Sequence, residues 1–223
     1  MHPRQFKDES FAHFARIGAA LGHAKRVEIV DVLAQGERSV ESLSEQISAS
    51  IATTSHHLQV LASAGLVTRR AEGTARIYRL TDPGVAAAYR TLVSLAETHI
   101  AEVTSLAEAF FSQADGLEPV SFDELDRIAR SGRAMIVDVR PASEYENGHV
   151  DGAINIPLAQ IADRMPDLPS DAHIVAYCRG PYCVMAATAV ARLRQAGFDA
   201  RRATGGYPEW RERALRPETV RAR

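Results

Sequence analysis

The sequence predicts two domains of different fold class: a mainly α-helical N-terminal domain with one β-hairpin, then an α/β domain with a parallel sheet. Residues 6–111 have helical periodicity that a single hairpin pattern interrupts, whereas from Pro119 onward short apolar strands alternate with helical stretches. Between them lies a small, polar segment with a turn signal at Asp115-Gly116. We therefore expect domains at residues 1–112 and 119–223, joined by a linker at residues 113–118.

The composition is that of a globular protein without a membrane segment. Of the 223 residues, 46% are hydrophobic and 24% are charged, as in ordinary folded domains. No apolar run approaches the roughly 18 residues of a membrane span, and residues 1–10 lack the apolar core of a secretory signal. The 2 cysteines, Cys178 and Cys183, exclude a disulfide scaffold and a zinc-finger set. We expect a cytoplasmic protein with no membrane partner.

The helical stretch before the linker carries apolar residues at a seven-residue spacing, which is typical of helix pairing. One row comprises Tyr89, Ala96, Val103 and Phe110, and the other comprises Leu92, His99 and Leu106. These two rows, the seam, can pack against another helix of the same chain. However, a long helix outside a compact unit more often pairs with its symmetry mate, so we expect a homodimer.

A helix-turn-helix is predicted upstream of this stretch. An amphipathic helix over residues 23–34 ends before Gly36, and a short helix follows at residues 40–47. Residues 48–50, Ser-Ala-Ser, supply a turn and an N-cap for a third helix over residues 51–63. Two helices joined by a tight turn are the defining feature of this DNA-binding motif.

The third helix has one apolar and one polar face. At about 100° per residue, Ile51, Thr54, Leu58 and Leu61 share one stripe, which we expect to face the core. The polar residues suited to base edges and phosphates are Thr53, Ser55, His56, His57 and Gln59. His57 lies close to the apolar edge. A polar face that is merely solvated is the alternative interpretation.

The segment after this helix favours DNA binding. Residues 66–70 and 75–80 form two short strand patterns around a glycine-bearing tip, with Arg69, Arg70, Thr74 and Arg76 placed to reach phosphate or the minor groove. The net charge of -2 argues against nucleic acid, but these arginines form a local basic edge. This hairpin is therefore expected to be a wing.

The run Thr54-Ser55-His56-His57-Leu58-Gln59-Val60-Leu61, continued by Ala64-Gly65-Leu66-Val67, resembles the ArsR family of winged-helix repressors over residues 10–112. The resemblance implies a dimer that binds operator DNA and releases it when a metal or an oxidant binds. The metal ligands of that family are incomplete here. Residues 39–43 contain no cysteine, and a site using Asp82, His99 and Glu102 meets Gly84 where a histidine belongs. We expect no metal, because three ligands are too few for a closed zinc site.

The C-terminal half contains a strand, loop and helix unit with a cysteine at its turn. A capping box at residues 121–124 opens a helix, and strands are expected at residues 134–139, 153–156 and 173–177. The last strand enters the loop Cys178-Arg179-Gly180-Pro181-Tyr182-Cys183-Val184, and a helix over residues 185–195 follows. This arrangement points loop N–H groups and a helix N-terminus at one position.

Cys178 occupies that position, where converging amides and the helix dipole favour the thiolate that attacks sulfur or electrophiles. A buried, inert cysteine is the alternative. Arg179 adds positive potential, Pro181 removes one amide donor, and Asp138 is expected to organise the loop. The candidate catalytic residues are Cys178, Arg179, Gly180, Tyr182, Cys183, Val184 and Asp138.

This half resembles a single-domain rhodanese over residues 119–213. The residues that carry the resemblance are Asp138-Val139-Arg140, Glu144-Tyr145, Gly148-His149, the segment 152–157, the Cys178 loop and the segment 205–210. It implies a three-layer domain with a parallel sheet, in which Cys178 carries sulfur as a persulfide. A cysteine phosphatase is excluded, because the arginine that binds phosphate six positions after the cysteine is Val184.

Two interpretations of Cys183 remain open: a resolving thiol that bridges to Cys178, or a small residue packed at a helix start. For the whole chain we predict a repressor-type regulator in which sulfur loading or oxidation of Cys178 changes operator affinity, with thiosulfate or polysulfide as sulfur donor and no cofactor. One alternative is a sulfurtransferase whose DNA-binding half controls its own synthesis. Another is an arsenic or electrophile sensor, which lacks a third thiolate.

Overall fold

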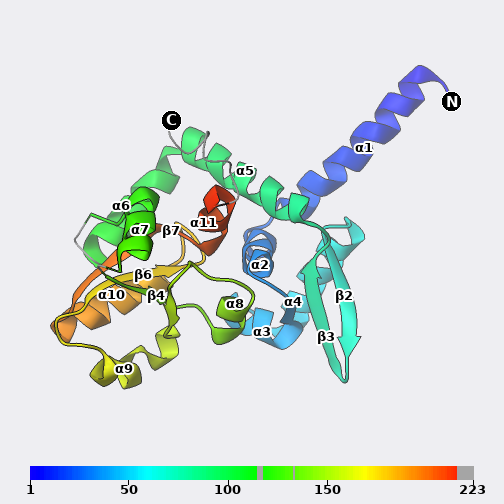
Figure 1. Cartoon of the computed structure of the whole chain (residues 1–223). Helices are drawn as coiled ribbons and strands as arrows, with labels where there is room; N and C mark the ends of the chain where they lie inside the picture. Colours follow the sequence, from blue (N-terminus) through cyan, green and yellow to red (C-terminus); the bar gives the residue numbers. More distant parts are fainter. Residues whose placement is uncertain (115–117, 133, 215–223) are drawn as a thin grey trace. The chain divides into compact units, whose positions relative to one another are not determined.

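The computed structural model describes residues 1–114, 118–132 and 134–214, and it divides the chain into two compact units, residues 1–99 and residues 100–223. Figure 1 shows the elements of both units. The predicted linker at residues 113–118 stays a prediction, because residues 115–117 lie outside the described part. Each unit is described by itself below.

The first unit has the order of elements that a winged helix-turn-helix requires. Its elements are α1 (Pro3–Leu21), α2 (Ala24–Ala34), β1 (Arg38–Ser39), α3 (Val40–Gln46), α4 (Ile51–Ser63), β2 (Val67–Glu72), β3 (Ala75–Leu80) and α5 (Pro83–His99). Ser39 caps α3 through a hydrogen bond from the Ser42 N–H, and Ser50 caps α4 through one from the Thr53 N–H. These caps fix where both helices of the motif begin.

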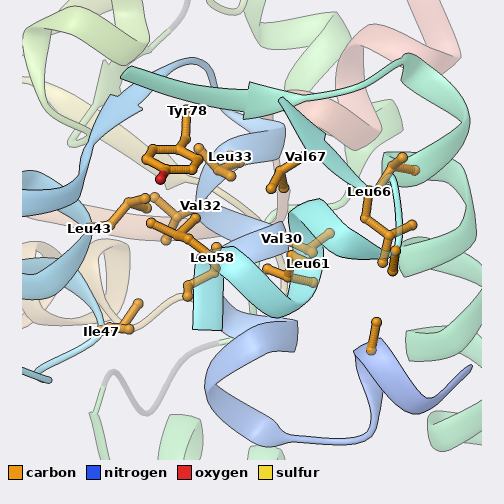
Figure 2. Packing of buried hydrophobic residues seen from close by; sticks show 14 of the residues in the cluster. Val30, Val32, Leu33, Leu43, Ile47, Leu58, Leu61, Leu66, Val67 and Tyr78 are labelled. Carbon is orange, nitrogen blue, oxygen red and sulfur yellow. The ribbon is translucent and has the colours of Figure 1, made fainter. Parts of the chain in front are cut away.

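One apolar core holds this unit together, and Figure 2 shows its packing. Val30 and Leu33 of α2 meet Leu58 and Leu61 of α4, and all four are buried. Tyr78 of β3 closes the cluster on the wing side. The core therefore fixes the position of α4 against α2.

The wing is a three-stranded antiparallel sheet in the order β1-β3-β2. β2 pairs with β3 from Val67↔Leu80 to Glu72↔Ala75, so the loop between them consists of Gly73 and Thr74. Gly73 has a φ of 58°, a conformation that glycine adopts at little cost. The predicted hairpin is confirmed, but β1 was not expected, because two residues are too few to show a strand pattern.

The predicted continuous helix of the seam is wrong. Helix α5 ends at His99, and a second helix, α6 (Ala101–Ala114), begins after Ile100. The Val103 N–H bonds to the Ile100 carbonyl oxygen as α6 begins. No glycine or proline marks this break, so apolar spacing alone did not reveal it.

The second unit is a three-layer α/β fold. After α6 its elements are α7 (Phe122–Ser131), β4 (Met135–Asp138), α8 (Ala142–Glu146), β5 (Ile154–Asn155), η1 (Leu158–Gln160), α9 (Ile161–Arg164), η2 (Met165–Asp167), β6 (His173–Cys178), α10 (Met185–Gln195), β7 (Asp199–Gly206) and α11 (Tyr207–Ala214). The strands form a parallel sheet in the order β5-β4-β6-β7. The predicted fold class is confirmed.

Alternate residues of the central strand β6 face opposite layers. Ile174, Ala176 and Cys178 pack in the cluster that contains α9 and α10. Val175 and Tyr177 pack in the cluster that contains residues of α7 and α11. The side chain of Cys178 therefore points towards the face of the sheet that α10 covers.

Candidate functional site

The loop between β6 and α10 brings both cysteines of the chain together. Cys178 is the last residue of β6, between the parallel neighbours β4 and β7. Its residue surface is only 3% exposed, whereas Cys183 is half-buried. The Cys178 thiol donates a hydrogen bond to the main-chain oxygen of Cys183 over 3.4 Å. The loop is thus curled so that residue 183 lies against residue 178.

Main-chain amides converge on both sulfur atoms, as the strand, loop and helix arrangement predicts. The N–H groups of Gly180 and Ala186 bond to Cys178, and those of Arg179 and Met185 bond to Cys183. For Cys178, however, burial outweighs these amides and raises the pKa of its thiol well above the usual value. At Cys178 burial thus opposes the stabilising amides, and the reactive thiolate expected there stays a prediction.

Cys183 is the more acidic thiol of the pair. A hydrogen bond with Cys178 lowers the pKa of Cys183 to about 7, and the amides of Arg179 and Met185 add to this effect. Because the two thiols are in contact, they titrate as a coupled pair, and burial raises the pKa of Cys178 while the contact with Cys178 lowers that of Cys183. The surroundings of the loop therefore favour a negative charge on Cys183, the more accessible sulfur, over one on Cys178.

Arg179, expected to add positive potential, is bound by a buried carboxylate. Its Nη2 lies 2.7 Å from Oε1 of Glu144, and its Nε donates to both Glu144 oxygens at 3.1 and 3.2 Å. The Glu144 side chain is fully buried and that of Arg179 is 12% exposed. Glu144 was part of the motif in the sequence, but its spacing did not reveal this role.

Gly206 holds the first half of the loop against the sheet. A Cβ atom at Gly206 would lie 2.2 Å from the carbonyl carbon of Arg179 and 2.4 Å from the oxygen of Cys178. Both atoms are backbone, so no side chain fits. The Gly206 N–H also donates to Glu209 over 2.9 Å. The main chain of β7 therefore fixes residues 178 and 179.

Asp138 belongs to a buried network one strand away. Its Oδ2 accepts hydrogen bonds from Nη2 of Arg140 and from the hydroxyl of Tyr177, both over 2.6 Å. Burial and the Asp138 charge raise the pKa of Tyr177, so this phenol stays protonated. Through the Tyr177 hydroxyl, Asp138 links β4 to β6, and its expected role in organising the loop stays a prediction.

The predicted DNA-contacting face of α4 is largely exposed. Thr53, His56 and Gln59 are exposed, and Ser55 is half-buried. Thr54, Leu58 and Leu61 are buried as expected, but Ile51 is 52% exposed, so its placement in the core was wrong. Ile51 is the first residue of the helix, beyond the reach of the core residues of α2.

His57 differs from its neighbours, because it is buried with an exposure of 6%. Its ring centroid lies 4.5 Å from that of His23 and 6.0 Å from that of His56. Burial lowers the pKa of His57, and the positive charges that His23 and Arg26 carry when protonated lower it further. We therefore leave His57 out of the proposed DNA-contacting surface.

The four predicted wing residues Arg69, Arg70, Thr74 and Arg76 are all exposed. Arg70 pairs with Glu37, at 2.8 Å, and with Glu72. Within the described ranges of the chain, Arg69 and Arg76 form no ion pair. Of the three arginines predicted to contact DNA, Arg69 and Arg76 therefore offer an approaching phosphate a charge that no described carboxylate balances.

Sequence reasoning missed an apolar surface on α1. Phe6, Phe11 and Phe14 are between 60% and 66% exposed, and the Phe11 and Phe14 rings lie 5.7 Å apart. On α5, Leu92 and Leu95 are also exposed. Polar residues separate these phenylalanines in the sequence, so the apolar surface that they form on the helix was not predicted.

Neither a metal cluster nor a membrane helix is found in the described residues. Among them, no group of three or more histidine, cysteine, aspartate or glutamate side chains is placed to hold a metal ion. In the same part of the chain, no helix is long and apolar enough to cross a membrane.

Comparison with known proteins gives two family matches, one in each half. The model described as bacterial regulatory protein, arsR family, matches residues 23–69, and that of the rhodanese-like domain matches residues 121–213. The HTH-type transcriptional regulator Rv0324 of Mycobacterium tuberculosis is 43% identical over 197 residues, which are 88% of this chain and 86% of that protein. The chain belongs to the ArsR family of bacterial regulators, in a form that carries a rhodanese-like domain.

Other similarities are confined to one half of this ArsR-family chain. Human thiosulfate:glutathione sulfurtransferase is 33% identical over 113 residues, covering 44% of this chain and 96% of that protein. The solved homodimeric winged helix-turn-helix domain of Mb0332 from Mycobacterium bovis is 37% identical and covers 45% of this chain and 91% of its own, with a TM-score of 0.42. Both resemblances noted in the sequence are confirmed by the family matches.

Proposed function

We propose that this ArsR-type regulator binds operator DNA with an affinity that depends on the sulfur or oxidation state of the Cys178 loop. The observation that carries the proposal is the contact between Cys178 and Cys183. Cys178 donates to the Cys183 carbonyl oxygen, and the pKa of Cys183 is lowered to about 7. A thiolate next to a second thiol is the arrangement that accepts sulfur and then closes a bridge.

The chemistry proposed for the pair has two steps. The Cys183 thiolate attacks the outer sulfur of a donor, the sulfur–sulfur bond of the donor breaks, and the leaving group departs with the electron pair. Cys178, once its proton has passed to solvent, attacks the persulfide of Cys183. This second step gives either a Cys178 persulfide with a free Cys183 thiolate, or a disulfide with release of hydrosulfide.

The DNA-binding part of the proposal rests on α4 and the wing. Thr53, His56 and Gln59 supply exposed donors and acceptors for base edges, and the unpaired Arg69 and Arg76 supply charge for phosphates. Phosphate contacts position a protein on the duplex, whereas base contacts select the sequence.

A homodimer is proposed from the exposed apolar side chains of α1 and α5. Phe11 and Phe14 are too exposed and too close together to be explained by the core of one chain. A second copy of the same surface buries them symmetrically. Phe14→Glu is expected to yield monomers in sedimentation analysis, whereas an unchanged dimer would rule out this surface.

The experiment that tests the proposal is an operator gel-shift titration with and without polysulfide. Wild type is expected to lose affinity after polysulfide treatment, and Cys178→Ser and Cys183→Ser are expected to respond less or not at all. Equal affinity in every condition would end the proposal.

A sulfurtransferase is the second candidate, favoured by the similarity to thiosulfate:glutathione sulfurtransferase. In that case the protein transfers sulfur from donor to acceptor over many turnovers, and Cys178→Ala abolishes this activity. The affinity for DNA then does not depend on the sulfur state of the loop. Turnover measured beside the gel shifts separates the two functions.

A further inference from the structure

The loop that holds the two thiols has little positive charge to offer a sulfur donor. Arg179 is the single charged residue of the segment 178–184. Its guanidinium is engaged by the buried Glu144 through contacts of 2.7, 3.1 and 3.2 Å. The charge of Arg179 is therefore balanced by Glu144, and its side chain, which is 12% exposed, is poorly accessible to an incoming molecule.

The exposed side chains of the loop carry no charge, and a carboxylate lies beside its first half. Tyr182 and Val184 are 40% and 48% exposed. The Glu209 carboxylate lies beside Gly180, where an added Cβ atom would be 3.6 Å from Oε1 and 3.7 Å from Oε2. The exposed side chains of the loop are therefore uncharged, and the charged group beside Gly180 is a carboxylate.

These charges discriminate between classes of sulfur donor. Thiosulfate is a dianion and leaves as the sulfite dianion, so its complex with the loop thiolate carries three negative charges. An organic persulfide, R–S–S–H, adds none when protonated. The thiolate attacks its outer sulfur, the S–S bond breaks, Cys–S–S–H forms and R–S⁻ leaves, so that one negative charge is present throughout.

Like charges brought together in a partly desolvated site repel strongly, and amide donors alone do not offset a dianion as cations do. We infer that the donor of this loop is an organic persulfide of low charge and not thiosulfate. This inference rests on the proposed function, because it names the substrate class of the same two thiols.

The test measures sulfur loading of the full-length reduced protein by mass spectrometry after incubation with cysteine persulfide or with thiosulfate. Each rate is divided by the rate of 2-mercaptoethanol with the same donor, which removes the intrinsic reactivity of the donor. The corrected rate with cysteine persulfide is expected to exceed that with thiosulfate by about a hundredfold. Equal corrected rates would overturn the inference.

Charge variants at Val184 give a second readout. Because this side chain is exposed, a charge there leaves the buried core unchanged. Val184→Lys is expected to raise the ratio of the thiosulfate rate to the persulfide rate by about tenfold, and Val184→Glu to lower it. A ratio that ignores the sign of the charge would also overturn the inference. If neither donor loads either cysteine, both the inference and the proposed function are wrong. If thiosulfate loads a cysteine rapidly, only the inference about the donor is wrong.

Discussion

The Tyr177 hydroxyl donates a hydrogen bond of 2.6 Å to Asp138, whose other partner, Arg140, is fully buried like Asp138 itself. Strand β6, which ends at Cys178, is thus joined to its neighbour β4 by a side-chain hydrogen bond as well as by the main-chain ladder. A buried ion pair of this kind is costly to break, because the partner left behind has no water to solvate it.

Asp138→Ala is expected to lower the free energy of unfolding of the rhodanese-like domain by about 3–5 kcal/mol. Urea unfolding followed by the fluorescence of Trp210, the 1 tryptophan of the chain, reports on this domain. The control is Glu124→Ala, which breaks a more exposed pair with Arg201 and should cost about 1 kcal/mol or less. Equal losses in the two variants would contradict this account.

His57 should make the winged-helix domain sensitive to acid. Its pKa is lowered in the folded state from 6.5, so the unfolded chain binds its proton first. Stability is therefore complete above about pH 6.5 and falls as the pH drops from there through the folded pKa. Far-ultraviolet circular dichroism in urea between pH 8 and pH 5 measures this loss.

His57→Leu is expected to flatten that pH dependence, whereas His13→Gln, a change at an exposed position of α1, is expected to leave it in place. A slope that survives in His57→Leu would assign the acid sensitivity to another group.

Alkylation of the thiols should depend on pH in a way that separates them. Since the pKa of Cys183 is about 7, its reaction with iodoacetamide should rise to half its limiting rate near pH 7 and exceed that of the buried Cys178. Peptide mass spectrometry reads both sites. Cys178→Ala removes the thiol that lowers this pKa, so the midpoint for Cys183 should move upward. An unmoved midpoint would show that the amides alone set it.

Wing arginines should contribute to DNA binding according to their ion pairs. Arg69→Ala and Arg76→Ala are each expected to weaken binding to any duplex and to reduce the slope of log affinity against log salt by about 1. Arg70→Ala should change the slope by less than half as much, because Glu37 and Glu72 already balance its charge. Fluorescence anisotropy over a range of salt concentrations measures all three, and a larger effect for Arg70 would contradict the ranking.

Local signals in the sequence were sufficient for the helix-turn-helix and for the thiol loop. The bounds expected for α4 and α10 agree with the structure, since Ser50 caps α4 and a glycine follows closely on each helix. By contrast, β7 was not expected, because Asp199–Gly206 contains two arginines and two glycines. Its place in the sheet depends on pairing with β6, which is a long-range contact.

The residues of the thiol loop could be predicted from the sequence, but the pKa of Cys178 and the pairing of Arg179 could not. The loop sequence indicated a cysteine surrounded by amides, and these amides are present. The burial that raises the pKa of Cys178 depends on α10 and on its apolar neighbours, which no local pattern describes. In the same way, the neutralisation of Arg179 by Glu144 joins residues 35 positions apart.

The contact of Gly206 with Cys178 and Arg179 leaves the two ends of the thiol loop with unequal freedom. Residues 178 and 179 are clamped by the main chain of β7, whereas Tyr182 and Val184 face solvent. If Cys178 carries an extra sulfur atom, we expect residues 181–184 to move and the end of β6 to stay in place, because β7 packs against it. A structural change caused by chemistry at Cys178 is therefore expected to start at residues 181–184.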